Sequence, residues 1–415
     1  MRRVVITGLG TVNSLGFDVK TSFPRLLAGE SGVRRITRFD VTEQTVKIAA
    51  EIQWDAEEHG FSKLEVRKLD LFTMWALMAS SEALRDAGLE NIRDEPESAR
   101  ERYGTIIATG IGGITGILQQ YDEMLKRGVR RVSPHFIPRI MSNAVSGQVA
   151  IRHGLMGTAF TTSSACASAG HAIGMAWRAI QWDECDLVVT GGAESATTDI
   201  SIAGFASAKA LSTRNDDPEG ASRPFDKDRD GFVMGEGCGL LVFEEYEHAK
   251  KRGATIYAEV KGYGSTDDAF HITAPKEDGA GPARAFEQAL KHAGISPDQV
   301  DYVNAHGTST KYNDEIETRA IKRVFGDHAR KLAVSSTKSM LGHLLGAATG
   351  VELVVTALAV AKGQVHPTRN YTTPDPECDL DYVPGDAREM TVRNALCNSL
   401  GFGGHNVCIC IGQVD

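Results

Sequence analysis

The stretch TTSSACASAG, residues 161–170, places a single thiol, Cys166, in a run of ten small residues. Residues 157–161 before it have strand character, and residues 169–182 after it carry apolar side chains at helical spacing. We therefore predict that Cys166 lies where a strand gives way to the N-terminus of a helix. Free backbone N–H groups and the positive end of the helix dipole meet there, and both lower the pKa of a thiol. The pattern thus favours a nucleophilic thiolate.

Charge around this stretch favours the same interpretation. Between Met124 and Trp182 there is no Asp or Glu, whereas Lys126, Arg127, Arg130, Arg131, Arg139, Arg152 and Arg178 all occur. The alternative is that Cys166 is an ordinary buried thiol, since free cysteine often serves as a small apolar core residue. The small residues around Cys166 keep a catalytic role open beside that alternative.

Composition limits the classes of function. The chain has 415 residues, 24% of them charged, and a formal net charge of −9, which argues against a general nucleic-acid binder. Its seven cysteines are odd in number and scattered, so we expect a reducing, cytoplasmic compartment. Residues 1–8 have the pattern of a strand and not of a signal peptide. The apolar run 351–361 is too short to span a bilayer. We expect no membrane insertion.

Strand-like and helix-like segments alternate along the chain, which predicts an α/β fold with buried sheets. Strands are expected at 4–8, 105–109 and 187–190, and Ser62 with Glu65 forms a capping box that opens a helix running towards Gly88. The acidic and basic residues at 226–231 lack the ligand spacing of a calcium loop and predict a solvated turn.

The pattern restarts near Gly253. Strands at 256–264 and 301–305 and a long helix at 339–363 repeat the earlier order, so we predict two related units, 1–254 and 255–415. A dinucleotide fingerprint is excluded, because Asn13 stands where the third glycine of that motif is required.

Possible partners of the thiol come from the second unit. His306 follows a strand in a small polar loop, and His343 stands where the long helix is expected to begin; each alone is most often structural. Within that apolar helix Glu352 requires a partner, since an unpaired buried carboxylate is costly, and Lys338 is the candidate. The glycines around Phe402 give a loop with accessible N–H groups, suited to an oxyanion donor or a mobile gate; the alternative is a plain turn.

Taken together and in order, these motifs resemble the elongating β-ketoacyl-acyl-carrier-protein synthases, the KAS I and KAS II condensing enzymes of the thiolase superfamily, most closely the bacterial KAS II type. The matching motifs are VVITGLG at 4–10, ACAS at 165–168, LSTRN at 211–215, RPFD at 223–226, DGFV at 230–233, GEG at 235–237, HGTST at 306–310, KSMLGH at 338–343 and GFGG at 401–404. They cover essentially the whole chain.

The resemblance implies a thiolase fold: two βαβαβαββ halves stacked as a five-layer α-β-α-β-α sandwich, usually as a homodimer. It implies that Cys166 accepts an acyl group, that His306 and His343 face a malonyl thioester, and that Lys338 and Glu352 support the site. The N–H groups of Cys166 and Phe402 would form an oxyanion hole, and Phe402 would also act as a gate. It places Thr308 and Thr310 beside the pantetheine arm and Ile111 at the end of the acyl pocket.

The implied reaction is a decarboxylative condensation that lengthens a fatty acyl chain by two carbons without an organic cofactor or a catalytic metal. A structural monovalent cation near Asn304 and Glu352 is a further implication of the resemblance. The implied partner, acyl carrier protein, is acidic, so its docking requires local positive charge. The candidate docking residues are Lys63, Arg67, Lys68, Arg130, Arg131, Lys209 and Arg214.

Three residues depart from the usual family pattern: Lys311 replaces a common Pro, Leu341 a frequent Thr, and His405 a Thr of many bacterial members. These departures bear on chain length and not on the reaction. A polyketide-type ketosynthase with the same chemistry stays an alternative. A thiolase is disfavoured, because Cys397 lacks the setting of its second catalytic cysteine, and a non-catalytic chain-length partner lacks the nucleophile that Cys166 supplies.

Overall fold

A computed structural model describes residues 1–414 of the chain, and its core is a mixed sheet of ten strands. The first half contributes β1 (Val4–Val12), β4 (Tyr103–Ala108), β5 (Ala159–Phe160), β6 (Leu187–Glu194) and β7 (Gly237–Glu245). The second half contributes β8 (Ala258–Asp267), β9 (Tyr302–Asn304), β10 (Ala333–Ser335), β13 (Asn394–Gly401) and β14 (His405–Gly412).

The strand order repeats between the two halves. The first half runs β5-β4-β6-β7-β1 and the second β10-β9-β13-β14-β8, with the same parallel and antiparallel pairs at equivalent positions. In the sheet, strands of the two halves pair where β1 meets β8, at Val5 with Glu259 and Ile6 with Ala258. The predicted division at residue 254 falls between α10 (Tyr246–Lys251) and β8.

Helices complete the repeat and separate the layers. The first half adds α3 (Leu71–Asp86), α7 (Ala144–His153) and α8 (Ser168–Gln181) between its strands, and the second adds α11 (Ala280–Ala293), α12 (Lys311–Phe325) and α14 (Ala348–Lys362). The order of strands and helices in each half is therefore βαβαβαββ, as the resemblance implies.

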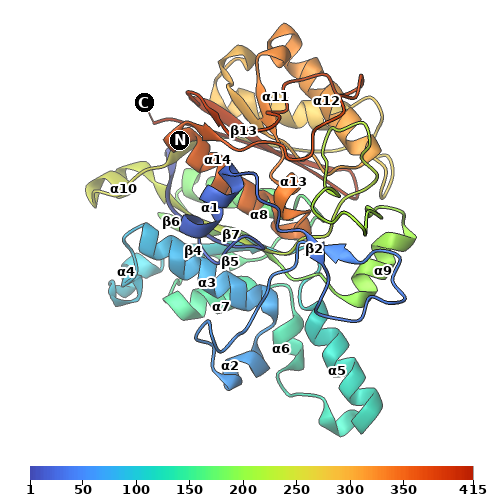
Figure 1. Cartoon of the computed structure of the whole chain (residues 1–415). Coiled ribbons are helices and arrows are strands. Elements are labelled where there is room, and N and C mark those ends of the chain that lie inside the picture. The colour runs from blue at the N-terminus through green and yellow to red at the C-terminus, as the bar shows by residue number, and fades with distance from the viewer. Residues whose placement is uncertain (415) are drawn as a thin grey trace.

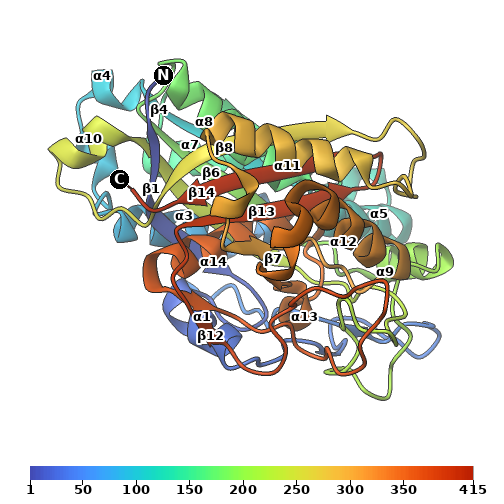
Figure 2. The ribbon, with the colours of Figure 1, turned by 90° about the horizontal axis from the view of Figure 1, so that it is seen from above.

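In Figure 1, α11 and α12 lie above β13, α14 and α8 form the middle layer, and α3 and α7 lie below the strands of the first half. Figure 2, from above, shows α11 over β14 beside β13. The predicted five-layer order is confirmed.

The middle layer carries the largest continuous core. Buried side chains of α8 and α14 pack between the two halves of the sheet and against each other. Close contact depends on small residues here: a Cβ on Gly174 of α8 would lie 2.2 Å from the Tyr263 ring of β8, and one on Gly170 would lie 2.6 Å from Val407 of β14. The small residues that flank Cys166 thus bring the two halves together at the start of α8.

Shorter elements surround this body. The helices are α1 (Val19–Leu27), α2 (Lys63–Lys68), α4 (Glu97–Arg100), α5 (Ile114–Arg127), α6 (Phe136–Ile140), α9 (Asp199–Ser207) and α13 (Lys338–Leu341), with short 3-10 turns η1 (Ile92–Asp94), η2 (Val129–Arg131), η3 (Pro297–Gln299), η4 (Gly326–Arg330) and η5 (Leu345–Ala347). Two small hairpins are β2 (Arg34–Arg35) with β3 (Ile48–Ala49) and β11 (Gln364–Val365) with β12 (Arg388–Glu389). In Figure 1, α5 and α6 project below the layers.

Two helices are shorter than the sequence predicts. The capping box at Ser62 is present, but α2 ends at Lys68 and Asp70 caps a separate helix, α3. The long helix expected from Ser339 is broken into α13, η5 and α14, with Leu345 at a φ of +48°. The stretch Leu345–Lys362 is long and apolar enough to cross a membrane, yet 89% of it is buried inside the protein. It serves here as a core segment.

Candidate active site

Cys166 lies on a tight turn two residues before α8, as the sequence predicts. Ala165 adopts a left-handed φ of +50°, which a larger side chain would tolerate poorly. The Ser168 hydroxyl closes the turn: it accepts from the Ser164 N–H at 2.8 Å and donates to the Ala165 carbonyl at 2.6 Å. The Ser399 hydroxyl of β13 donates to the Cys166 carbonyl at 3.0 Å. The thiol is thus held in place from both halves of the chain.

The resting thiol is not acidic, contrary to the prediction from its helix end. Burial raises the pKa of Cys166 to about 11, although the charge of Lys338 and the N–H groups of Phe402 and Cys166 act in the opposite direction. Desolvation outweighs the helix terminus because the thiol has almost no contact with water. The N–H groups of Phe402 and Cys166 both act on the sulfur, and their role as an oxyanion hole stays a prediction.

His343 contacts the thiol directly, with its Nε2 3.0 Å from the Cys166 Sγ. Its Nδ1 accepts from the Leu345 N–H at 3.3 Å, so in the neutral ring the proton belongs on Nε2 and points at the sulfur. His343 lies in the break between α13 and η5, and not at the start of a long helix as predicted. The irregular backbone of that break is what brings the Leu345 N–H to the ring.

His306 stands beside His343, with ring centroids 5.3 Å apart and planes at 85°. Its backbone N–H donates to the buried Glu317 carboxylate at 2.7 Å, which fixes the loop after β9. Burial and the nearby Lys338 hold the pKa of both imidazoles well below the usual histidine value. Both rings are therefore neutral around pH 7 and can donate an N–H to a developing negative charge.

The predicted partnership of Lys338 and Glu352 is present. The Lys338 Nζ donates to Glu352 Oε1, and both side chains are buried. The second carboxylate oxygen, Oε2, has no hydrogen-bond partner within the described chain. Asn304 donates to the Glu352 carbonyl at 3.2 Å. An anionic oxygen left without a donor fits the expectation of a cation here.

Phe402 is the half-exposed member of the loop after β13, with 37% of its surface accessible. This loop lies against the nucleophile: a Cβ on Gly401 would come 2.9 Å from the Ser164 carbonyl and 3.3 Å from the Cys166 nitrogen. It also bonds to the segment after β8, through Gly403 N–H to the Ile272 carbonyl at 2.7 Å and Asp268 N–H to the Gly404 carbonyl at 2.9 Å.

One cavity of about 680 Å³ unites most of the predicted site. Among its lining residues are Cys166, His306, His343, Phe402, Thr308, Thr310, Ile111 and Lys209. Lys338 and Glu352 are buried and do not line it. The other candidate docking residues lie elsewhere on the surface, as described below.

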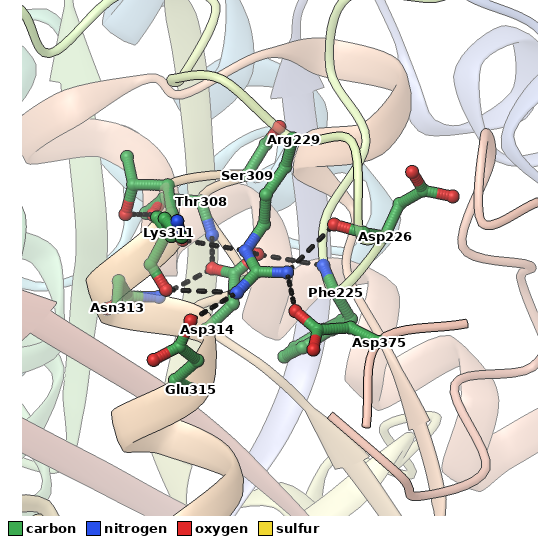
Figure 3. A network of polar contacts seen from close by, with 12 residues as sticks. Phe225, Asp226, Arg229, Thr308, Ser309, Lys311, Asn313, Asp314, Glu315 and Asp375 are labelled. Carbon is green, nitrogen blue, oxygen red and sulfur yellow. Dashed lines mark hydrogen bonds and ion pairs between the residues drawn. The ribbon is translucent and has the colours of Figure 1, made fainter. Parts of the chain in front are cut away.

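The segment 226–231 is only in part the solvated turn that its charges predict, since Lys227, Asp228 and Asp230 are exposed whereas Asp226 and Arg229 are not. Arg229 is buried, and Figure 3 shows its guanidinium surrounded by acceptors from three segments. Its five N–H groups match five acceptors: the carbonyls of Asp226, Thr310 and Lys311 and the carboxylates of Glu315 and Asp375, at 2.6–3.1 Å. Arg229 lines the cavity and fixes the turn that carries Thr308 and Thr310, whose hydroxyls are 2.9 Å apart.

The candidate docking residues form two groups. Arg67 of α2 borders a small surface hollow together with Ser133 and Arg139, close to the segment that carries Arg130 and Arg131, and Lys63 and Lys68 belong to the same short helix. Lys209, just after α9, lies at the cavity, and Arg214 packs on the turn before Gly231 by donating to the Asp228 carbonyl at 2.6 Å.

Cys166, His306 and His343 also meet the geometry of a metal site, since one ligand atom of each lies within 4.8 Å of the others. Neutral imidazoles and a thiolate are suitable ligands for a soft cation. The expectation that the reaction needs no cofactor or metal stays a prediction.

Sequence reasoning missed several lining residues. Phe232 stacks edge-on against His343 with centroids 5.3 Å apart, and Leu345 supplies the N–H that orients that ring. Phe232 follows the glycine that ends the charged segment. This position in the sequence indicates that Phe232 lies near the site, but only once Arg229 is known to be buried. Nothing in the apolar stretch after His343 singles out Leu345, because its role depends on a backbone turn.

Comparison with known proteins identifies the family. Residues 1–249 match the family described as "Beta-ketoacyl synthase, N-terminal domain" and residues 257–372 match "Beta-ketoacyl synthase, C-terminal domain". The chain belongs to the beta-ketoacyl synthase family.

Relatives of this synthase match along its full length. It is 48% identical to the 3-oxoacyl-[acyl-carrier-protein] synthase 2 of Coxiella burnetii, covering 100% of this chain and 99% of that protein. It is 49% identical to the protein of the same name from Synechocystis, covering 98% and 97%. The chain is accordingly an acyltransferase of the condensing type.

Solved structures agree with this membership. A beta-ketoacyl synthase from Burkholderia phymatum superposes with a TM-score of 0.91 at 36% identity, covering 100% of both chains. A type II polyketide ketosynthase in complex with its acyl carrier protein gives 0.91 at 35% identity over 100% of both chains. The thiolase fold expected from the sequence is thereby confirmed.

Proposed function

We propose that this chain is a 3-oxoacyl-[acyl-carrier-protein] synthase of the KAS II type. The observation that carries the proposal is the meeting of Cys166 with two neutral imidazoles, His306 and His343, in one cavity. Relatives that carry this name are nearly half identical over the full length, whereas the polyketide ketosynthase is more distant at 35%. Fatty acyl elongation is therefore favoured over the polyketide alternative.

Acylation uses the nucleophile turn. The Cys166 sulfur attacks the thioester carbonyl of the acyl carrier protein, and the negative charge that develops on the carbonyl oxygen is stabilised by the N–H groups of Cys166 and Phe402. The carbon–sulfur bond to pantetheine then breaks, and the proton lost from Cys166 ends on the departing pantetheine thiol. The acyl chain extends towards Ile111, which lines the same cavity.

Condensation uses the two histidines. The malonyl thioester loses its carboxylate as carbon dioxide, and the electron pair of the broken bond forms an enolate. Neutral N–H donors of His306 and His343 stabilise the enolate oxygen in a site from which water is largely excluded. The enolate carbon attacks the acyl–Cys166 carbonyl, a carbon–carbon bond forms, and the Cys166 thiolate leaves. The product is a 3-oxoacyl thioester two carbons longer.

The direct test supplies the enzyme with malonyl carrier protein and acyl carrier proteins of several chain lengths. We expect release of carbon dioxide and a 3-oxoacyl carrier protein two carbons longer than the acyl donor, measured by mass spectrometry. If that product forms with none of the chain lengths tested, the proposed function is refuted.

We further propose that acyl carrier protein docks on the basic groups described above. Reversal of Arg67 and Lys68 to glutamate is expected to lower kcat/KM with carrier-protein substrates by about tenfold to 100-fold, since charge on a docking surface mainly sets the rate of encounter. The surface ion-pair residue Lys250, which is 3.6 Å from Glu247, serves as the control for reversal. An equal loss with Lys250→Glu would contradict a local docking surface.

The protein is proposed to act as a cytoplasmic homodimer. Support comes from apolar side chains that are exposed on β5 and on the segments that precede it in the sequence, namely Ile117, Tyr121, Leu125, Val129, Ile137, Met141, Ile151, Met156 and Phe160. An edge strand leaves unpaired N–H and C=O groups that a second copy can satisfy. Sedimentation equilibrium is expected to give twice the chain mass of 44.7 kDa, and a monomer would contradict the assembly. Cell fractionation tests the proposed cytoplasmic location.

A further inference from the structure

Glu194, the last residue of β6, is a buried carboxylate that the mechanism above leaves without a role. It accepts four hydrogen bonds: from Gly110 N–H at 2.7 Å, Gly346 N–H at 3.1 Å, Ile111 N–H at 3.2 Å and the Thr109 hydroxyl at 3.0 Å. These four donors, and no charged residue, are what oppose the cost of its burial. Such an arrangement fixes backbone geometry at several points.

Three of these bonds hold the wall of the acyl pocket. Gly110 and Ile111 follow β4, and both line the catalytic cavity. Oε2 takes the Gly110 N–H, and Oε1 takes the Ile111 N–H and the Thr109 hydroxyl. The place of the Ile111 side chain in the cavity therefore depends on the Glu194 carboxylate.

Another bond holds the loop behind His343. Oε2 accepts the Gly346 N–H, directly after Leu345 with its left-handed φ of +48°. The same turn brings the Leu345 N–H within 3.3 Å of the His343 Nδ1, which leaves the proton on the Nε2 that faces Cys166. Glu194 thus lies two hydrogen-bonded steps from the ring that meets the thiol.

The two sides are also packed against each other around the carboxylate. A Cβ on Gly346 would lie 2.1 Å from the Gly110 nitrogen, and a Cβ on either glycine would lie 2.7 Å from Glu194 Oε2. Only glycine fits at both positions, so the loop after β4 and the loop after His343 cannot shift independently. One carboxylate joins the acyl side of the cavity to its malonyl side.

We propose that Glu194 is a positioning residue that sets the acyl-pocket wall at Ile111 and the orientation of His343 together. The inference rests on the roles proposed above for Ile111 and His343. Acyl-chain selection and decarboxylation would then both depend on the Glu194 side chain. Substitution of Glu194 is therefore expected to change both acyl-chain selection and decarboxylation. Which of the two changes first depends on which of its four contacts the substitution removes.

The order of the expected effects follows from Glu194→Gln, which replaces one carboxylate oxygen with an amide NH2 group. In Glu194→Gln the amide nitrogen is best placed towards the Thr109 hydroxyl, which can reverse and accept, while the remaining oxygen keeps Gly110 and Gly346. The Ile111 N–H loses its acceptor. We expect the ratio of kcat/KM for long and short acyl donors to change by about fivefold or more, with carbon dioxide release within about twofold of wild type.

Glu194→Ala removes both sets of contacts. Carbon dioxide release is expected to fall by about tenfold to 100-fold, because misplacement of a catalytic group by around 1 Å has effects of that order. If the alanine variant does not fold, Glu194→Asp, which is too short to keep all four contacts, takes its place. Glu82→Gln is the matched control: Glu82 also accepts two backbone N–H groups, from Val19 at 2.7 Å and Thr11 at 2.8 Å, but does not line the cavity.

A second readout is independent of synthase activity. The charge of Glu194 raises the pKa of the Cys166 thiol, while Lys338 and the N–H groups of Phe402 and Cys166 lower it. Alkylation of Cys166 by iodoacetamide, followed against pH, is therefore expected to begin at lower pH in Glu194→Gln and at the wild-type pH in Glu82→Gln. This measurement needs no acyl transfer, so it reports on the surroundings of Cys166 even if the wild type elongates no acyl chain, an outcome that would refute the proposed function alone.

The proposal is overturned if the Glu194 variants match Glu82→Gln in thermal stability, chain-length ratio and alkylation profile. It is also overturned if Glu194→Ala slows all donors equally and leaves decarboxylation and alkylation unchanged, since Glu194 would then only stabilise the fold.

Discussion

Cys166→Ala is expected to abolish condensation, with a loss of at least about 10³-fold, because Cys166 is the one thiol of the described residues that lines the cavity. The six remaining cysteines, Cys185, Cys238, Cys378, Cys397, Cys408 and Cys410, are buried and do not line it. Intact-mass analysis after incubation with acyl carrier protein should show one acyl adduct on the wild type and none on the variant. An adduct on Cys166→Ala would place the nucleophile elsewhere.

A different substitution of the same residue, Cys166→Gln, separates the two half-reactions. Decarboxylation depends on His306 and His343 and not on the thiol, so Cys166→Gln, which fills the thiol's position with an amide, should still release carbon dioxide from malonyl carrier protein. Changing both histidines to alanine should stop that release, by about 10³-fold or more, since loss of a single such donor costs about 10²–10³-fold. His153→Ala provides the control, because His153 is a half-buried, neutral histidine that is held by Ser80 and does not line the cavity.

A double-histidine variant that decarboxylates normally would refute the enolate assignment. It would leave the 3.0 Å contact between His343 and Cys166 as an interaction that serves acylation alone. Release of carbon dioxide is the readout that matters here, because loss of condensation by itself does not tell the two steps apart.

Much of the fold follows from local pattern. Alternating strand and helix signals predicted an α/β fold with two related units, and the small residues around Cys166 predicted the turn that opens α8. The βαβαβαββ order within each unit came from the resemblance to the condensing enzymes and not from the pattern. The break after His343 was not predictable in the same way. Residues 344–362 are almost all apolar and favour one helix, whereas Leu345 has a left-handed φ and the next residue, Gly346, donates its N–H to Glu194, 152 positions earlier in the sequence.

Electrostatics of the site were the least predictable from sequence. A helix terminus is visible in the pattern, but the burial that raises the pKa of Cys166 is produced by both halves of the chain together. Likewise the charges around Arg229 suggest a solvated turn, because its partners Glu315 and Asp375 lie far along the sequence. The pairing of Lys338 with Glu352 was predictable, since an isolated carboxylate in an apolar stretch requires a nearby cation.

That pair gives the largest expected effect on stability. Lys338→Met leaves the Glu352 carboxylate buried without its cation, which should lower the free energy of unfolding by about 3–5 kcal/mol. Burial already raises the pKa of Glu352, so the variant can relieve the loss by taking up a proton. The folded-state pKa of that carboxyl then exceeds its unfolded value, and the deficit relative to wild type should shrink as pH falls and grow as pH rises through the folded pKa. Urea unfolding at several pH values measures this.

The double variant Lys338→Met with Glu352→Leu removes both charges and should recover most of the lost stability, because a buried ion pair is often no more stabilising than apolar residues of similar volume. Lys126→Met, which breaks the exposed pair with Asp122, is expected to stay within about 0.5 kcal/mol of wild type. If the double variant is as unstable as Lys338→Met alone, the cost comes from packing and not from an unpaired charge. If it is stable but no longer condenses, the pair is present for its effect on Cys166, His306 and His343, whose pKa values the Lys338 charge lowers.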